Sequence, residues 1–302
     1  MPWPVRCRDV EESRPGGPRD LNRQRGRPTL SGALTSWRPA ACLAVLLLLP
    51  GAAWAGEELP PLSADRPDQT NGPGLVPPGT VQVELGATRA EATDGGNEAV
   101  AESWGQTLVR LGLFDDCELR LAFDGWREVR SSGPAGRGSI QGTGDSSIGA
   151  KLRLVEEGAR RPAVSLLATL ILPTGEVALR RARATPQVVF AFGHELSPRL
   201  SLSANLGAEW DTLPADAERP ERAVLTGLAS VSLGIGLGER WGAFVELFGV
   251  RAEAAVTGLG FDAGLACLLR PNLQIDAAAS VRLDGPLDDR FATIGLSFRL
   301  PH

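Results

Sequence analysis

The feature that most constrains the fold of this chain is a two-residue alternation of apolar and polar side chains that runs from Thr80 to residue 300. Residues 200–210, for example, read Leu-Ser-Leu-Ser-Ala-Asn-Leu-Gly-Ala-Glu-Trp. Successive side chains of a β-strand point to opposite faces, so this period predicts strands and an all-β fold. About twelve such segments follow one another, at residues 80–90, 104–113, 118–127, 145–155, 162–172, 186–196, 200–210, 222–236, 241–250, 259–269, 273–283 and 291–300.

The connections between these segments alternate in length. Short turns, such as 197–199 and 270–272, alternate with longer polar or Gly-rich stretches. A transmembrane up-and-down barrel has this pattern, with strands of about 9–11 residues, short periplasmic turns and longer outer loops. A soluble β-sandwich does not require every second connection to be long. We therefore expect a transmembrane up-and-down antiparallel β-barrel of about 12 strands over residues 80–300, with the longer loops at 91–103, 128–144, 174–185, 211–221, 251–258 and 284–290.

An apolar run near the N-terminus predicts export. Residues 41–50 read Ala-Cys-Leu-Ala-Val-Leu-Leu-Leu-Leu-Pro, with Arg38 before them and the small-x-small site Ala53-Trp54-Ala55 after them. This run is shorter than the roughly 20 residues of a membrane-spanning helix and is typical of a cleavable signal peptide. We expect a signal peptide over residues 37–55, cleavage before Gly56, and a mature protein in a bacterial outer membrane.

Two further segments precede the strands. Residues 1–36 hold seven Arg and no apolar periodicity; they are either a disordered basic leader or a stretch that is not translated, with the start nearer Leu30. Residues 56–79 are rich in Pro, which removes a backbone donor and excludes a helix or a central strand. We expect 56–79 to be an irregular periplasmic leader.

Charge and composition limit the partners and the chemistry. Without the eight Arg and four acidic residues of 1–55, the chain has nine more acidic than basic residues, which argues against nucleic acid as a partner. Only His194 and His302 could act as a histidine base, so we do not expect an enzyme. No cofactor or metal motif is present in the sequence, and whether Cys117 and Cys267 pair stays open. The expected partners are outer-membrane lipid, the outer-membrane assembly machinery and a small solute.

The polar face of the strands is the candidate site. Alternation places its side chains inside a membrane barrel, where they either select or conduct a solute or form a structural network of paired charges. The candidate lumen-facing residues are Glu84, Arg110, Arg120, Asp124, Lys151, Arg153, Asn205, Glu209, Glu246, Asp262, Asp276, Arg282 and Arg299, together with Gln274.

Several short motifs, in order, resemble a known family. They are Asp65-Arg66-Pro67-Asp68, Val76-Pro77-Pro78-Gly79, Leu172-Pro173-Thr174-Gly175 and Pro271-Asn272-Leu273, with Gly295-Leu296-Ser297-Phe298 near the end. This order is similar to that of the bacterial outer-membrane family described as the putative MetA pathway of phenol degradation, or simply as "transporter". The resemblance covers about residues 63–300. It implies a barrel with a transport or passive-pore role for small solutes, including hydrophobic or aromatic compounds; the alternative is a non-conducting barrel that presents its loops.

Overall fold

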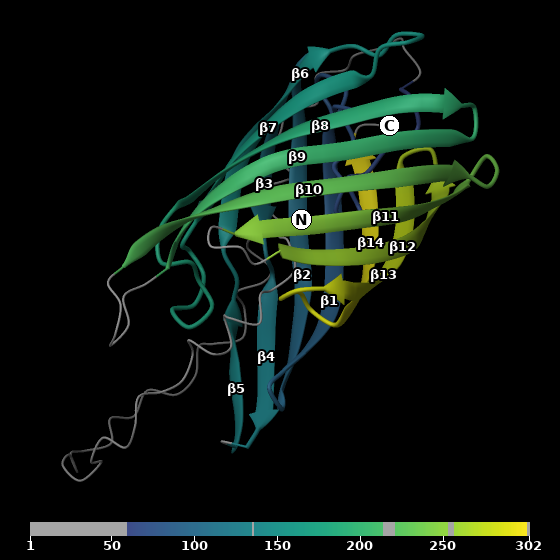
Figure 1. Ribbon diagram of the computed structural model, residues 1–302. Helices are drawn as coiled ribbons and strands as arrows, with labels where there is room; N and C mark the ends of the chain where they lie inside the picture. Colours follow the sequence, from purple (N-terminus) through teal and green to yellow (C-terminus); the bar gives the residue numbers. More distant parts are fainter. Residues whose placement is uncertain (1–58, 135, 214–220, 253–256, 301–302) are drawn as a thin grey trace, which may run out of the picture. The chain divides into compact units, whose positions relative to one another are not determined.

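The computed structural model describes residues 59–134, 136–213, 221–252 and 257–300. The basic leader and the signal peptide expected over 1–36 and 37–55 lie outside these ranges. The described chain forms one antiparallel sheet (Figure 1). Its strands are β1 (Val81–Asp94), β2 (Asn97–Phe114), β3 (Cys117–Phe123), β4 (Trp126–Gly133), β5 (Gly136–Thr143), β6 (Ser146–Val155), β7 (Ala163–Leu172), β8 (Thr185–Ser197), β9 (Leu200–Leu213), β10 (Arg222–Gly236), β11 (Trp241–Ala252), β12 (Thr257–Arg270), β13 (Leu273–Asp284) and β14 (Arg290–Leu300).

The sheet closes into a barrel because β1 pairs with both β14 and β2. The long strand β2 pairs with β3 through its second half and with β4 through its first half. On the other side of β3 and β4, β6 pairs with β3 and β5 pairs with β4. β3 with β4, and β5 with β6, therefore each form one interrupted strand, so the 14 named strands make the 12-stranded antiparallel barrel that the alternation predicts.

The interruption between β3 and β4 lies at Gly125, whose φ is 80°. A Cβ at this position would lie 2.2 Å from the Trp104 carbonyl oxygen of β2, so only glycine allows the two strands to approach this closely. Backbone hydrogen bonds continue across the break, from Asp124 N to the Asp145 oxygen and from Gly144 N to the Gly125 oxygen. The backbone pairing of the barrel wall therefore continues across this break.

The prediction of an outer loop is wrong for two segments. Residues 91–103 and 128–144 mostly belong to strands: β1 and β2 meet at a tight turn through Gly95 and Gly96, and β4 and β5 form a second hairpin. Both glycines have positive φ (53° and 83°), as a two-residue hairpin turn requires. Figure 1 shows β4 and β5 extending past the rest of the wall. Beyond the lipid a strand needs no apolar face, so its alternation is lost and the sequence pattern reads as a loop.

The distribution of side chains is that of a barrel in lipid. On β13, for example, Gln274, Asp276 and Ser280 are buried, whereas Ile275 and Val281 are 40% and 49% exposed. A soluble barrel has the opposite arrangement. Trp104 and Trp126 lie opposite each other on β2 and β4, and they are exposed, as are Trp210 and Trp241. Tryptophan is enriched at the boundary between lipid and water, so these side chains indicate the edges of the membrane zone.

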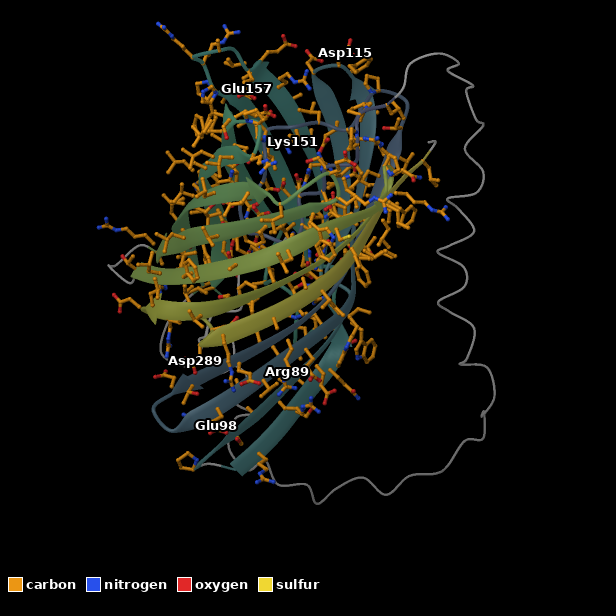
Figure 2. The ribbon with its side chains drawn as sticks, turned by 90° about the vertical axis from the view of Figure 1, so that its right-hand side faces the viewer. Arg89, Glu98, Asp115, Lys151, Glu157 and Asp289 are labelled. Atoms are coloured by element: carbon orange, nitrogen blue, oxygen red, sulfur yellow. The ribbon has the colours of Figure 1, made fainter. Side chains whose placement is uncertain are left out.

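Figure 2 identifies the two ends of the barrel. Asp115 and Glu157, from the short turns, lie at one end; Glu98 and Asp289 lie toward the other, and Lys151 lies between. Within the described residues no helix is both long and apolar enough to span a membrane. Cys117 and Cys267 are both free thiols.

Candidate functional site: the barrel lumen

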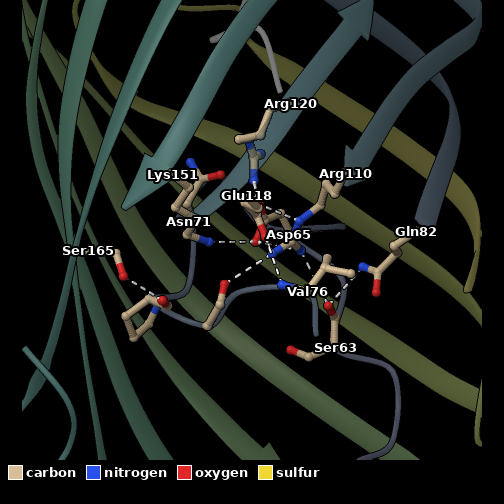
Figure 3. Close-up of polar contacts among 12 residues, drawn as sticks. Ser63, Asp65, Asn71, Val76, Gln82, Arg110, Glu118, Arg120, Lys151 and Ser165 are labelled. Carbon is tan, nitrogen blue, oxygen red and sulfur yellow. Dashed lines mark hydrogen bonds and ion pairs between the residues drawn. The ribbon is translucent and has the colours of Figure 1, made fainter. Parts of the chain in front are cut away.

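The described part of the Pro-rich leader, residues 59–79, lies inside the barrel. It contacts inward-facing side chains of strands on opposite walls: Arg66 contacts β13 and β14, Asn71 contacts Asn205 of β9, and Val76 contacts Glu118 of β3. It enters near the turn between β12 and β13, where Leu62 N donates to the Pro271 oxygen over 2.7 Å. It leaves beside β2, where Gly79 N donates to the Gly112 oxygen. The leader is therefore a loop held within the lumen (Figure 3).

A cluster of six buried charged side chains surrounds one part of this loop. Asp65 of the leader lies 2.6 Å from Arg120, 3.3 Å from Arg110 and 3.4 Å from Lys151. Glu84 and Glu118 complete the cluster, at 3.3 Å and 2.9 Å from Arg110. Three basic and three acidic groups balance in charge, as burial of ionised groups requires. Burial alone would raise the pKa of Asp65, but the charges of Arg110, Lys151 and Arg120 outweigh it and hold that pKa far below its usual range.

The backbone of the leader is fixed by the same carboxylates. Glu118 accepts a hydrogen bond from Val76 N at 2.8 Å, and Glu84 accepts from Asp65 N at 3.1 Å. These wall groups therefore satisfy donors of a segment that has no secondary structure to pair with. The contacts explain how an irregular chain can be buried in the lumen.

Arg66 anchors the leader to another part of the wall. Its Nε lies 3.3 Å from Asp276 Oδ1, and its Nη2 donates to the Thr293 hydroxyl over 2.7 Å. The guanidinium lies over Gly86 of β1 and Gly295 of β14, which are directly paired. A Cβ at either glycine would lie 2.2 Å from a guanidinium nitrogen. Two glycines facing each other across the strands thus make the space that this side chain occupies.

Next along the leader, Gln69, Thr70 and Asn71 bind the walls formed by β9, β10 and β11. Gln69 N and the Thr70 hydroxyl donate to the two oxygens of Glu246 over 2.8 and 2.6 Å. Thr70 also shares a 2.6 Å hydrogen bond with Ser230. Asn71 N donates to Asn205 Oδ1 over 2.8 Å, and Asn205 Nδ2 donates back to the Asn71 oxygen. This reciprocal pairing fixes the middle of the loop.

An apolar layer fills the lumen toward the outer end. On β11 the inward side chains change from Glu246 to Phe248 and Val250, and the Phe248 ring lies 6.3 Å from that of Phe291 on β14. Leu287, from the loop between β13 and β14, is buried in the same cluster. The remaining members are Ala90, Leu167, Val189, Ala191 and Leu228. The lumen therefore has a charged zone around the leader and an apolar zone beyond it.

The loop between β7 and β8 turns inward over this end. Asp145 accepts hydrogen bonds from Gly175 N and Arg181 N, both at 2.9 Å. The Arg181 guanidinium then reaches Glu209 at 2.9 Å and Asp211 at 2.8 Å, on the inward face of β9. The loop is thus held at both sides of the mouth by charged contacts.

The structure brings most of the candidate lumen residues into these groups. The charged cluster includes Glu84, Arg110, Arg120 and Lys151. The leader contacts include Asn205, Glu246 and Asp276, and Glu209 contacts Arg181 at the barrel mouth. Gln274 lies 3.4 Å from Asp276 and Asp262 lies opposite Glu246. The others are near the ends: Arg153 pairs with Glu156, Arg282 pairs with Asp289, Arg299 donates to the Pro60 oxygen, and Asp124 lies at the break between β3 and β4.

The sequence prediction omitted several residues that share these contacts. Glu118 has the same parity as Arg120, so the alternation itself could have identified it. Asp65, Arg66 and Asp68 lie in an irregular segment, and Arg181 lies in a loop; neither has a period from which a direction could be inferred. Their place in the lumen is decided by tertiary contacts alone.

Comparison with known proteins agrees with this architecture. The family model described as "Putative MetA-pathway of phenol degradation" matches residues 64–300. No curated protein sequence matches the chain. Among solved structures, the COG4313 outer membrane channel from Pseudomonas putida F1 is 14% identical, with 74% of this chain and 97% of that chain covered and a TM-score of 0.59. This similarity shows the fold of an outer-membrane barrel.

Two other structures are more distant. The NanC porin is 7% identical over 72% of this chain and 98% of its own, with a TM-score of 0.47. The translocator domain of the autotransporter NalP from Neisseria meningitidis is 12% identical over 72% and 87%, with a TM-score of 0.45. Likenesses at this level add nothing to the assignment. The fold and the apolar outer surface of the strands place this barrel in the outer membrane of a Gram-negative bacterium.

Proposed function

Because this chain belongs to the family of the putative MetA pathway of phenol degradation, whose model spans residues 64–300, we propose that it is a gated outer-membrane channel for small solutes. The observation that carries the proposal is the content of the lumen. A 21-residue segment of the chain, 59–79, occupies the space between the walls, and it is held there by side-chain contacts rather than by strand pairing. A barrel that holds this segment has room for a passage once the segment moves.

The two zones of the lumen indicate what would pass. The charged zone would bind the polar groups of a solute, and the apolar zone around Phe248 and Phe291 would accept its apolar or aromatic surface. A solute with both kinds of surface, such as a small aromatic compound with a polar substituent, meets both requirements. The reference to phenol degradation in the family description agrees with this class of solute.

In this proposal the leader and the loop between β7 and β8 obstruct the passage, because both contact inward-facing side chains of the wall. Opening requires the leader to leave the walls, because its residues contact β1, β9, β11, β13 and β14. The alternative function, a non-conducting barrel with a permanent plug, is favoured by the balanced ion pairs of the charged cluster. The two functions differ in one measurable property, which is conductance that depends on leader movement.

A disulfide between leader and wall tests this directly. Thr70 and Ser230 have their hydroxyl oxygens 2.6 Å apart, so cysteines at these two positions would hold their sulfur atoms side by side. We would introduce Thr70→Cys and Ser230→Cys in a Cys117→Ser, Cys267→Ala background and record conductance in planar bilayers. The oxidised protein should be silent, and a reductant should restore channel events to the level of the Thr70→Cys control. Absence of conductance in both redox states and at every voltage would reject the channel; equal conductance in both would reject the leader as its gate.

A further inference from the structure

A row of inward-facing polar side chains crosses three neighbouring strands at the level of Thr70. Ser232 of β10 lies opposite Glu246 of β11, and Glu246 lies opposite Asp262 of β12. The leader adds a third carboxylate, since Asp68 Oδ2 accepts a hydrogen bond from the Ser232 hydroxyl at 3.3 Å. Asp68, Glu246 and Asp262, which we name the acidic latch, therefore lie together, one on the leader and two on the wall.

The acidic latch differs from the charged cluster around Asp65. That cluster pairs each carboxylate with a guanidinium or ammonium group. Across the described ranges, no Arg, Lys or His forms an ion pair with any of the three latch carboxylates. Asp262 is fully buried, and neither of its carboxylate oxygens has a hydrogen-bond partner there. A buried carboxylate without donors is unfavourable when ionised, so this site needs an additional positive charge.

The groups that face Asp68 do not supply this positive charge. Glu246 comes from β11, Asp262 from β12, and Asp65 from the leader itself, whereas β10 presents only hydroxyls. Within the described residues no three acidic, cysteine or histidine side chains converge closely enough to hold a metal ion. Protons bound to the carboxylates can neutralise the site without any further group. Burial, together with the charges of Glu246 and Asp262, raises the pKa of Asp68 well above its ordinary value.

We propose that the acidic latch is a proton-operated switch that holds the leader against the wall at acidic pH and releases it as the pH rises. When protonated, the three carboxyl groups can share hydrogen bonds, and Glu246 keeps its contacts with Gln69 and Thr70. When ionised, two negative wall groups face a negative leader group. The repulsion acts between leader and wall, so it drives the two apart. This inference rests on the proposed function, because it supplies the signal that opens the same passage.

The direction of the pH dependence follows from proton binding. Asp68 binds its proton more tightly in the docked leader than in the released one, so docking is strongest below the ordinary pKa of an aspartate. It weakens from about pH 4 upward and is lost as the pH passes the docked pKa. Asp65 behaves in the opposite way, since its lowered pKa keeps its ion pairs intact down to strongly acidic pH. The part of the leader near residues 68–72 therefore moves first, while the Asp65 end stays bound.

A thiol probe at Gly72 measures this movement. A Cβ at Gly72 has no atom within 4 Å, so Gly72→Cys fits the docked leader. In the Cys117→Ser, Cys267→Ala background we would measure the rate of maleimide labelling between pH 5 and pH 8. Each rate is divided by that of Glu239→Cys, an exposed turn position, at the same pH, which removes the intrinsic titration of the thiol. The normalised rate should rise about tenfold between these two pH values.

The isosteric double variant Glu246→Gln, Asp262→Asn should abolish this rise, while Glu128→Gln, on the outward face of β4, should leave it unchanged. Heat-dependent gel migration checks that each variant is folded. A flat rate in the parent, a rise retained in the double variant, or release by Ca²⁺ at constant pH would each overturn the switch. Labelling does not require conduction. A pH-dependent rate in a protein that never conducts would therefore leave the latch in place and reject the channel.

Discussion

Arg110 of β2 holds Glu118 of β3 through two hydrogen bonds, Nε to Oε1 and Nη2 to Oε2, each 2.9 Å long. Both side chains are fully buried, and Glu118 also accepts the backbone N–H of Val76 from the leader. A two-point contact of this kind fixes the orientation of both groups. The pair therefore joins two neighbouring strands and the lumen segment in one rigid unit.

Glu118→Gln should destabilise this unit strongly. It leaves Arg110 and Arg120 with an excess positive charge in a buried site, and breaking one partner of a buried ion pair costs about 3–5 kcal/mol. The unfolding temperature, read from heat-dependent gel migration, should fall. Glu221→Gln removes an exposed ion pair with Arg183 and should produce no measurable change. Equal stability of the two variants would show that the cluster does not hold the fold together.

Gly295→Ala should displace Arg66. The new methyl group would lie 2.2 Å from the Arg66 Nε and 2.6 Å from an Asp276 oxygen, so the guanidinium has to leave its place between β1 and β14. We expect faster labelling of Gly72→Cys and more frequent channel openings. Gly242→Ala is the matched control, because a Cβ there meets no atom within 4 Å. Unchanged labelling in Gly295→Ala would mean that Arg66 does not anchor the leader.

Phe248→Ala tests the apolar zone. Phe248 is 2% exposed in the lumen, and its loss should leave a cavity that costs about 3–5 kcal/mol if the surroundings do not collapse. Phe261 of β12 faces outward and is 37% exposed, so Phe261→Ala should cost less. Unfolding temperatures of both variants in one detergent give the comparison. A larger effect at Phe261 would contradict the packed apolar zone.

Arg181→Ala should free the loop between β7 and β8 from the barrel mouth. It removes the contacts with Glu209 and Asp211 on β9, and the loop retains Arg180 and Arg183 as trypsin sites. Cleavage of the folded barrel at these sites should become faster. Arg183→Ala removes only an exposed pair with Glu221 and one trypsin site, so it should not accelerate cleavage. Similar cleavage in both variants would show that Arg181 does not hold the loop.

Strand β1 continues past the segment 80–90 in which the sequence shows apolar alternation. Within the membrane one face of a strand is turned toward lipid, as with Val81 and Leu85 of β1, and this requirement produces the alternation in the sequence. Beyond it, both faces of the β1–β2 and β4–β5 hairpins are free of lipid. The apolar period disappears although the strands continue, which is why 91–103 and 128–144 were predicted as loops.

The sequence by itself determined the all-β barrel of 12 strands, the short turns and the parity of residues such as Glu84, Arg110 and Glu246, because lipid on one face and a polar interior on the other impose a local period. Only the tertiary structure decided that residues 59–79 fill the lumen, that Asp65 joins Arg110, Arg120 and Lys151, and that Asp68 meets Glu246 and Asp262. The physical reason is that an irregular segment has no period. Its position depends on contacts with strands that are distant in sequence, such as the contact between Arg66 and Thr293, which are 227 residues apart, and these contacts exist only once the barrel has closed.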